Sequence, residues 1–206
     1  MRWCVAVLLA LAVVGCAGSA GPTLSAPTTG DCAGIPVIPH DHPPDELHFT
    51  RDETLEGKIP DLIDGMPVQD VASATWIETL CSLGGQASVD ASRSGAPGGV
   101  DIGNLTVASG RAVVDGLGVT IAAFRLPGHD GNELVPVIGI ESTVVASAPP
   151  KFTTDLEPAT VGGKSVKRWT DAADGSVSYL YGSGDTLFVV ENVTPSQADK
   201  VFAALP

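Results

Sequence analysis

The clearest alternation of hydrophobic and polar positions lies near the C-terminus. Residues 166–169 and 177–181 alternate or are rich in β-branched and aromatic side chains, which predicts two strands. The Gly-Ser-Gly-Asp stretch at 182–185 is typical of a tight hairpin turn and leads into a third apolar strand at 187–190.

A helix is predicted to follow these three strands. Thr194 is a good N-cap residue, and Pro195 suits the first helical turn because its fixed φ matches the helix and its missing N–H would be unpaired there. Val201, Phe202 and Leu205 then fall on one helical face. This part of the chain therefore has the predicted order β-β-β-α.

The first half has a weaker pattern of the same kind. It predicts strands at 66–74, 105–114 and 119–126, followed by a helix over about 132–140. Pro136 within that helix would cost several kcal/mol unless it falls in the first turn. Residues 82–103 show no periodicity and are interpreted as a loop.

A short internal similarity links the two halves. Residues 60–68 align with 158–166, with Pro, an aliphatic residue, Gly and Val at the same spacing. We therefore predict an α+β fold, a two-layer antiparallel sheet with helices on one face, composed of two β-β-β-α repeats at 45–150 and 151–206. Chance agreement at four positions is the alternative.

The N-terminus has the pattern of a secretory signal. Arg2 precedes an uncharged stretch whose strongly apolar part, 5–14, is too short for a membrane span of about 20 residues. The sequence Val13-Val14-Gly15-Cys16 then resembles the lipobox of bacterial lipoproteins. That resemblance implies a signal peptide at 1–15, a lipidated Cys16, and palmitate-type acylation that holds the chain at the extracytoplasmic face of the cell membrane. An ordinary signal peptide with an incidental cysteine is the alternative.

The residues after Cys16 are predicted to form a tether. Residues 16–44 are rich in Gly, Pro, Ser and Thr and cannot bury enough apolar surface to offset the entropy of ordering. If Cys4 leaves with the signal and Cys16 carries lipid, Cys32 and Cys81 remain in an oxidising compartment and are predicted to form a disulfide. Two free thiols are the alternative.

Charge excludes one class of partner. The formal net charge is −13, from 11 Lys and Arg against 24 Asp and Glu. Such a surface repels nucleic acid, so we expect no nucleic-acid partner. The expected partners are the membrane, through the lipid, and a protein or small molecule that the sequence does not identify.

The one candidate for metal chemistry is a histidine-rich segment. His40, His42 and His48 lie within nine residues. Three carboxylates accompany them, namely Asp41, Asp45 and Glu46. Imidazoles and carboxylates bind zinc, copper or nickel, but the spacing matches no established ligand pattern. A solvated segment leading into the domain is the competing interpretation.

Other motifs favour structural roles. No GxSxG motif is present, so a nucleophile elbow is not indicated. Gly-Gly-Lys-Ser at 162–165 ends like a phosphate-binding loop, but Pro158 stands where the first glycine is required, and a turn into a strand is the better interpretation. Asp130 or Asn132 is expected to cap the next helix, beside His129.

The large aromatic residues are interpreted mainly as core and cross-strand pairs, with a ligand-binding face as the alternative. They are Trp76, Trp169, Tyr179, Tyr181 and Phe188.

The strand start VGGKSV and the hairpin YLYGSGDTLFVV resemble lipoproteins of actinobacterial type whose activity is not defined. That resemblance implies the fold and no activity. We therefore expect a non-enzymatic, cofactor-free, membrane-anchored binding or envelope-associated module. A metal-handling lipoprotein is the alternative.

Overall fold

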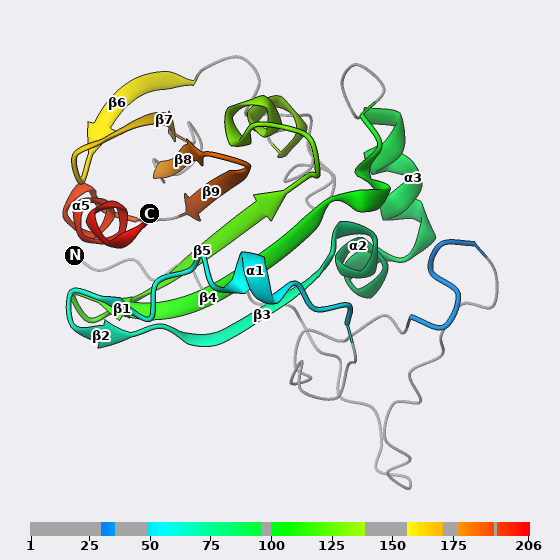
Figure 1. Ribbon diagram of the computed structural model, residues 1–206, viewed down its shortest axis with the longest axis horizontal. Helices are drawn as coiled ribbons and strands as arrows, with labels where there is room; N and C mark the ends of the chain where they lie inside the picture. Colours follow the sequence, from blue (N-terminus) through cyan, green and yellow to red (C-terminus); the bar gives the residue numbers. More distant parts are fainter. Residues whose placement is uncertain (1–29, 36–48, 96–99, 139–155, 171–176, 192) are drawn as a thin grey trace, which may run out of the picture.

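The computed structural model describes residues 30–35, 49–95, 100–138, 156–170, 177–191 and 193–206 (Figure 1). Its centre is a seven-stranded antiparallel sheet in the order β3-β4-β5-β9-β8-β7-β6. These strands are β3 (Gln69–Thr75), β4 (Thr106–Val114), β5 (Leu117–Arg125), β6 (Glu157–Val161), β7 (Lys164–Thr170), β8 (Val177–Ser183) and β9 (Thr186–Glu191). A separate two-stranded sheet pairs β1 (Leu62–Ile63) with β2 (Met66–Pro67). The predicted α+β class is confirmed.

Strands from both halves of the chain join one sheet. β5 of the first half pairs with β9 of the second, with Ile121 opposite Val190. The first half contains helices between β3 and β4, and the second half has four strands rather than three before helix α5 (Pro195–Ala204). The predicted pair of β-β-β-α repeats is therefore not confirmed.

The two segments aligned by sequence nevertheless form the same kind of turn. Asp64 and Gly65 connect β1 to β2 with φ of 51° and 77°, and Gly162 and Gly163 connect β6 to β7 with φ of 55° and 78°. Two consecutive positive φ angles are characteristic of the type I′ turn, whose twist matches that of a two-residue hairpin. The local similarity thus encodes a hairpin in both places.

The sheet is buried on both faces. Along β5, Val119, Ile121 and Ala123 belong to one hydrophobic cluster, whereas Ala122 and Phe124 contact the other. Because successive strand residues point to opposite faces, the two clusters lie on opposite sides of the sheet. β5 is therefore covered on both sides, which explains its nearly continuous apolar sequence.

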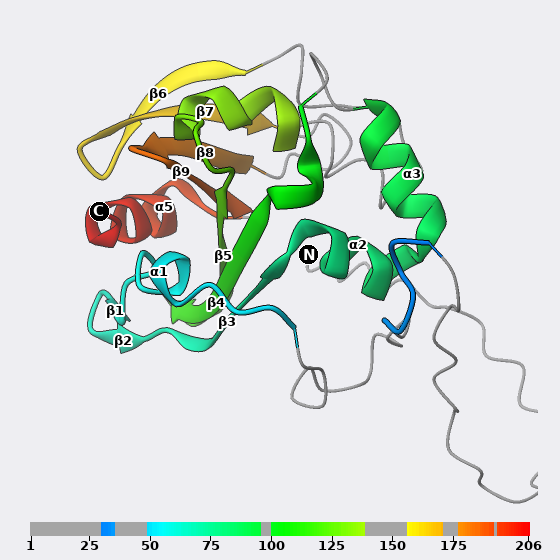
Figure 2. The same cartoon turned by 45° about the vertical axis from the view of Figure 1, so that its right-hand side comes forward.

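Helices pack against both faces rather than one. Leu55 of α1 (Glu53–Glu56) and Phe202 of α5 belong to the first cluster. Leu80 of α2 (Trp76–Gly84) and Val89 of α3 (Gln86–Gly95) belong to the second. Figure 2 shows α1 and α5 on one side of the strands and α2 and α3 on the other. The predicted two layers are thus extended by a third, because both faces of the sheet are apolar.

Helix α3 occupies much of the segment that was predicted to be a loop. α2 begins at a capping box in which Thr75 and Glu78 satisfy each other's backbone N–H groups, and it continues to Gly84. The positive φ of Gly85 ends it and redirects the chain into α3. α3 has few apolar positions, so its sequence carries little helical periodicity.

The predicted helix at 132–140 begins as a 3₁₀ turn. Asp130 caps η4 (Gly131–Leu134) by accepting a hydrogen bond from Asn132 N–H, and residues 135–138 continue it as helix. Pro136 lies near the start of that helical stretch, where proline is tolerated. Residues 139 and 140 lie outside the described residues.

Strand β6 forms one edge of the sheet, and Pro158 suits that position. Val161 pairs with Lys164 across the two-residue turn, so the alternation of the antiparallel ladder directs the backbone of Pro158 away from β7. The missing N–H of proline therefore removes no hydrogen bond from the sheet, and it blunts the exposed edge against pairing with another strand.

The β6–β7 turn touches α5 closely, and this gives a testable prediction. A Cβ at Gly162 would lie 2.5 Å from Ala203 N and 2.7 Å from Asp199 O, whereas a Cβ at Gly163 would have no atom within 4 Å. Both have positive φ, so both alanine variants strain the backbone. We expect Gly162→Ala to lower the free energy of unfolding by about 1–3 kcal/mol more than Gly163→Ala, as measured by urea denaturation. Equal losses would contradict the close packing.

None of the described helices combines the length and the apolar character needed to cross a membrane.

Candidate functional site

The first described segment, 30–35, is fastened to α2 by a disulfide. Cys32 and Cys81 are bonded, with 5.3 Å between their Cα atoms, and both are fully buried. The predicted disulfide is thus present. Leu80, the neighbour of Cys81 in α2, is also fully buried, so the helix turns this side towards the interior and places the sulfur within reach of the N-terminal segment.

Polar contacts support the disulfide. Arg93 of α3 makes two hydrogen bonds to the carboxylate of Asp31, at 2.6 and 2.9 Å. The side chain of Gln86 accepts from Cys32 N–H and donates to Asp31. The hydrogen bonds from Arg93, and then from Gln86, hold the pKa of the Asp31 carboxyl below its usual range. We call residues 30–35 the first strap.

A second strap lies where the chain re-enters the described structure. Thr50 donates from its backbone N–H and its hydroxyl to Glu78, which also caps α2. Burial acts to raise the pKa of Glu78, but the hydrogen bonds from Thr75 and Thr50 outweigh it and the net shift is downward. We call residues 49–52 the second strap.

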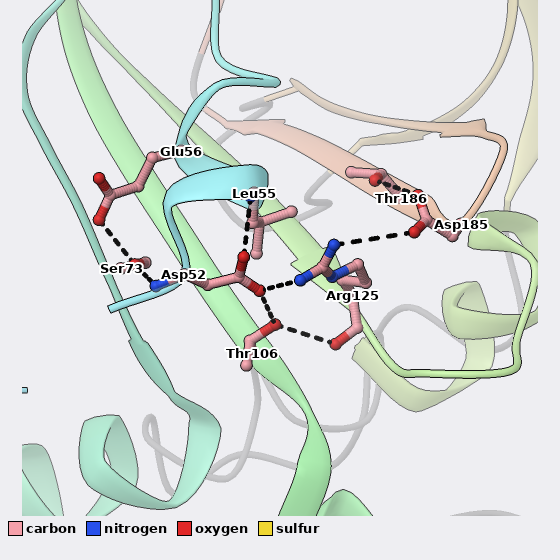
Figure 3. A network of polar contacts seen from close by, with 8 residues as sticks. All are labelled: Asp52, Leu55, Glu56, Ser73, Thr106, Arg125, Asp185 and Thr186. Atoms are coloured by element: carbon pink, nitrogen blue, oxygen red, sulfur yellow. Dashed lines mark hydrogen bonds and ion pairs between the residues drawn. The ribbon is translucent and has the colours of Figure 1, made fainter. Parts of the chain in front are cut away.

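Asp52 joins this strap to the sheet (Figure 3). Its carboxylate forms an ion pair with Arg125 at the end of β5 and accepts a hydrogen bond of 3.0 Å from Leu55 N–H in α1. The hydroxyl of Thr106 in β4 lies 3.2 Å from Asp52 Oδ2. Arg125 also lies 3.9 Å from Asp185 Oδ2 in the β8–β9 turn. One arginine therefore connects the strap to the β8–β9 hairpin of the second half.

Ser73 and Glu56 complete the same network. The Ser73 hydroxyl accepts from Asp52 N–H at 2.6 Å and donates to Glu56 at 2.7 Å. Glu56 also forms an ion pair with Arg51. The pKa of Glu56 is lowered, chiefly by the hydrogen bond from Arg51, with a further contribution from Ser73.

The chemistry of this network is that of a clamp. Asp52, Glu56 and Arg125 each already contact an oppositely charged group and a further polar atom. Groups engaged in this way hold chain segments together. Together the two straps secure the residues that precede and follow segment 36–48.

A matched pair of substitutions tests the clamp. The side chain of Asp52 is 13% exposed and that of Asp185 is 51% exposed. Asparagine at position 52 keeps the helix cap but removes the charge facing Arg125. We expect Asp52→Asn to lower the free energy of unfolding by about 1–2 kcal/mol and Asp185→Asn by less than about 0.5 kcal/mol, measured by urea denaturation. Equal effects would show that Arg125 does not depend on Asp52.

A second polar cluster lies at the opposite end of the sheet. Lys200 of α5 contacts Asp64 at 2.8 Å and Asp115 at 2.6 Å, and these aspartates occupy the β1–β2 and β4–β5 turns. The hydrogen bonds to Asp115 and then Asp64 raise the pKa of Lys200. Asp115 and Gly116 have φ of 52° and 77°, so this turn is also of type I′. One lysine thus joins two Asp-Gly turns.

Exposed apolar side chains surround these two turns. The large hydrophobic residues exposed in the described chain are Leu62, Met66, Val113 and Leu117. Each lies two residues before the aspartate or two residues after it, in the matching sequences LIDGM and VVDGL. We call these two turns, with their four apolar residues, the hairpin tip.

The predicted lipid and metal residues cannot be placed. Cys16, His40, His42 and His48 lie outside the described residues. Among the residues that the structure does describe, no group of three or more His, Cys, Asp or Glu side chains is arranged to hold a metal ion. Both assignments stay predictions.

The structural interpretations of the other motifs are confirmed. The large aromatics line the core: Trp76, Trp169, Tyr179 and Phe188 are buried and Tyr181 packs against Phe188. Gly162 and Gly163 form a turn that feeds a strand, and no helix follows them as a phosphate-binding loop requires. Asp130 is a cap, and His129 lies 3.3 Å from Glu133.

Sequence reasoning missed the clamp and the hairpin tip. Asp52, Arg125 and Asp185 are far apart in the chain, and isolated charges give no signal of their partners. The hairpin tip did leave a signal, because Asp-Gly between apolar residues is the strongest short-range mark of a two-residue hairpin.

Comparison of the chain with protein-family models, with curated proteins and with solved structures found no match in any of the three.

Proposed function

We propose that this protein is a lipid-anchored, extracytoplasmic binding module without enzymatic activity. The supporting observation is the Cys32–Cys81 disulfide. It is fully buried and joins the first strap to the domain. Disulfides persist in oxidising compartments outside the cytoplasm, which agrees with a chain exported by the N-terminal signal.

The position of the disulfide also agrees with an anchor at Cys16. Fourteen residues separate Cys16 from Gly30, where the described structure begins. A fully extended chain spans at most about 3.6 Å per residue, so such a tether reaches roughly 50 Å at most. The first strap fastens the domain end of this tether, so the domain would be held close to the membrane surface.

Two features favour binding over catalysis. The charged groups of the clamp are engaged with one another and hold the second strap to the sheet. The hairpin tip, in contrast, presents exposed apolar side chains on turns that Lys200 holds together. Exposed apolar groups with polar surroundings are characteristic of interaction surfaces.

A pair of cysteine variants tests the anchor. We expect the wild-type full chain to fractionate with membranes and to incorporate radiolabelled palmitate in the producing bacterium. Cys16→Ser should lose the label and the lipoprotein-type cleavage, because the acyl acceptor is gone. Cys4→Ser is the matched control and should behave as wild type, since the signal peptide is removed. Acylation of the Cys16→Ser variant would contradict the assignment.

A second candidate is metal handling by His40, His42 and His48. The observation that favours it is that the segments on either side of 36–48 are both held to the domain by the two straps. Titration of the full chain with Zn²⁺ and Cu²⁺ in a calorimeter tests it. Micromolar or tighter binding that disappears when all three histidines become alanine would support it, and the absence of heat would dismiss it.

A further inference from the structure

The hairpin tip concentrates the exposed apolar surface of the described chain. The exposed fractions are 56% for Leu62, 45% for Met66, 50% for Val113 and 59% for Leu117. Two short hairpins that are 47 or more residues apart in sequence carry all four. Single exposed apolar residues are common on proteins, but a group of large ones at one place marks a contact surface.

The tip is a firm platform because α5 holds both turns. Lys200 bridges Asp64 and Asp115, and the buried side chain of Gln197 donates a hydrogen bond of 2.9 Å to the carbonyl oxygen of Val114. Ser196 adds a contact of 3.4 Å to Asp115. A pre-ordered surface loses little conformational entropy on binding, so even a modest contact area can yield measurable affinity.

Charges of both signs remain uncompensated beside these apolar residues. Lys58 and Arg111 are cationic, and Asp61 and Asp70 are anionic. Within the described structure none of these four side chains forms an ion pair or a side-chain hydrogen bond. Asp61 adjoins Leu62, Arg111 is two residues from Val113 on the same face of β4, and Asp70 follows Gln69, which pairs with Arg111. The surface around the tip thus offers two free cations and two free anions.

From this pattern we propose that the hairpin tip binds the hairpin tip of a second copy of this chain in a two-fold homodimer. In a two-fold interface the same patch meets itself, so the patch must be self-complementary in charge as well as apolar. Equal numbers of free cations and anions beside four apolar side chains meet that requirement. The proposal does not depend on the lipid anchor.

The overall charge does not prevent this contact. The net charge of −13 opposes association of two copies, but at physiological salt charges more than about 8 Å apart are largely screened. The local pairs across the interface are therefore favoured over repulsion between the distant surfaces. In both Figures 1 and 2 the β1–β2 hairpin lies at the end of the molecule remote from the first strap, so a tether leaving Gly30 does not cover the tip.

Complementary charge reversals test the proposal on the full chain in detergent, with the protein mass measured by light scattering after gel filtration. We expect the wild type to have twice the mass of one 20.9 kDa chain. Lys58→Glu with Arg111→Glu leaves only anions at the tip, and Asp61→Lys with Asp70→Lys leaves only cations. Each double variant alone should have the mass of one chain. An equimolar mixture of the two should recover the dimer, because opposite tips now meet.

Two further variants separate the tip from other causes. Lys167→Glu makes the same charge change on β7, at an exposed residue away from the tip, and should leave the dimer intact. Leu62→Ser with Leu117→Ser removes apolar contact without altering charge and should give the mass of one chain. A wild type that is monomeric at every concentration, a dimer that survives the tip variants, or a mixture that fails to associate would each overturn the proposal.

Discussion

Replacing both Cys32 and Cys81 with alanine should lower the free energy of unfolding by about 4 kcal/mol. The bond closes a loop with a sequence separation of 49, and on the chain-entropy model a loop of that length restricts the unfolded state by about this amount. The variant also loses the covalent link between the first strap and α2, which leaves that strap held mainly by the contacts of Asp31 with Arg93 and Gln86.

Urea denaturation with and without reductant measures this effect. Trp76 and Trp169 are buried, so their fluorescence reports unfolding. Reductant should lower the urea midpoint of the wild type and leave that of the double alanine variant unchanged, because only the wild type has the bond. A wild-type midpoint that does not respond to reductant, in protein shown by unfolding to be accessible to it, would contradict the assignment.

Phe202→Ala should cost about 3–5 kcal/mol, the usual loss for removing a large aromatic ring from a core. Phe202 is fully buried on α5 and meets Tyr179 and Tyr181 edge-on, with ring centroids 5.8 and 6.1 Å apart. The cavity would lie between the helix and β8. Since α5 holds the two turns of the hairpin tip through Lys200, its loosening should disturb the tip as well.

The matched control is Ala203→Ser, the neighbouring residue on the exposed side of the same helix. It should change the free energy of unfolding by less than about 0.5 kcal/mol, as surface substitutions generally do. Calorimetric melting of both variants would make the comparison. If the two variants melted together, the packing of α5 against the sheet would not be a major source of stability.

Local patterns predicted the parts of the fold that depend on neighbouring residues. The last three strands and α5 were predicted because alternation, a Gly-containing turn and a Thr-Pro helix start all lie within short windows. Strand β6 was missed because Pro158 interrupts its pattern, and only its place at the sheet edge makes proline acceptable there. Helix α3 was missed because much of what holds it is distant, notably the contact of Arg93 with Asp31.

The candidate sites show the same division. The disulfide was inferred by counting cysteines, since only Cys32 and Cys81 remain once the N-terminal pair is assigned. The clamp could not be inferred, because Asp52 and Arg125 are 73 residues apart and any arginine would have been an equally good guess. The Asp-Gly turns were visible in the sequence, but their union by Lys200 was not.

By itself, then, the sequence determined the α+β class, the positions of most strands, the cysteine pairing and the acidic character of the surface. Each of these follows from residue type and short-range spacing, which the chain carries wherever its segments come to lie. The tertiary structure alone decided that the two halves share one sheet with helices on both faces. It also decided which charges meet in the clamp and which apolar side chains stay exposed at the hairpin tip. These depend on which distant segments become neighbours, and that choice is made by the packing of the whole core rather than by any local pattern.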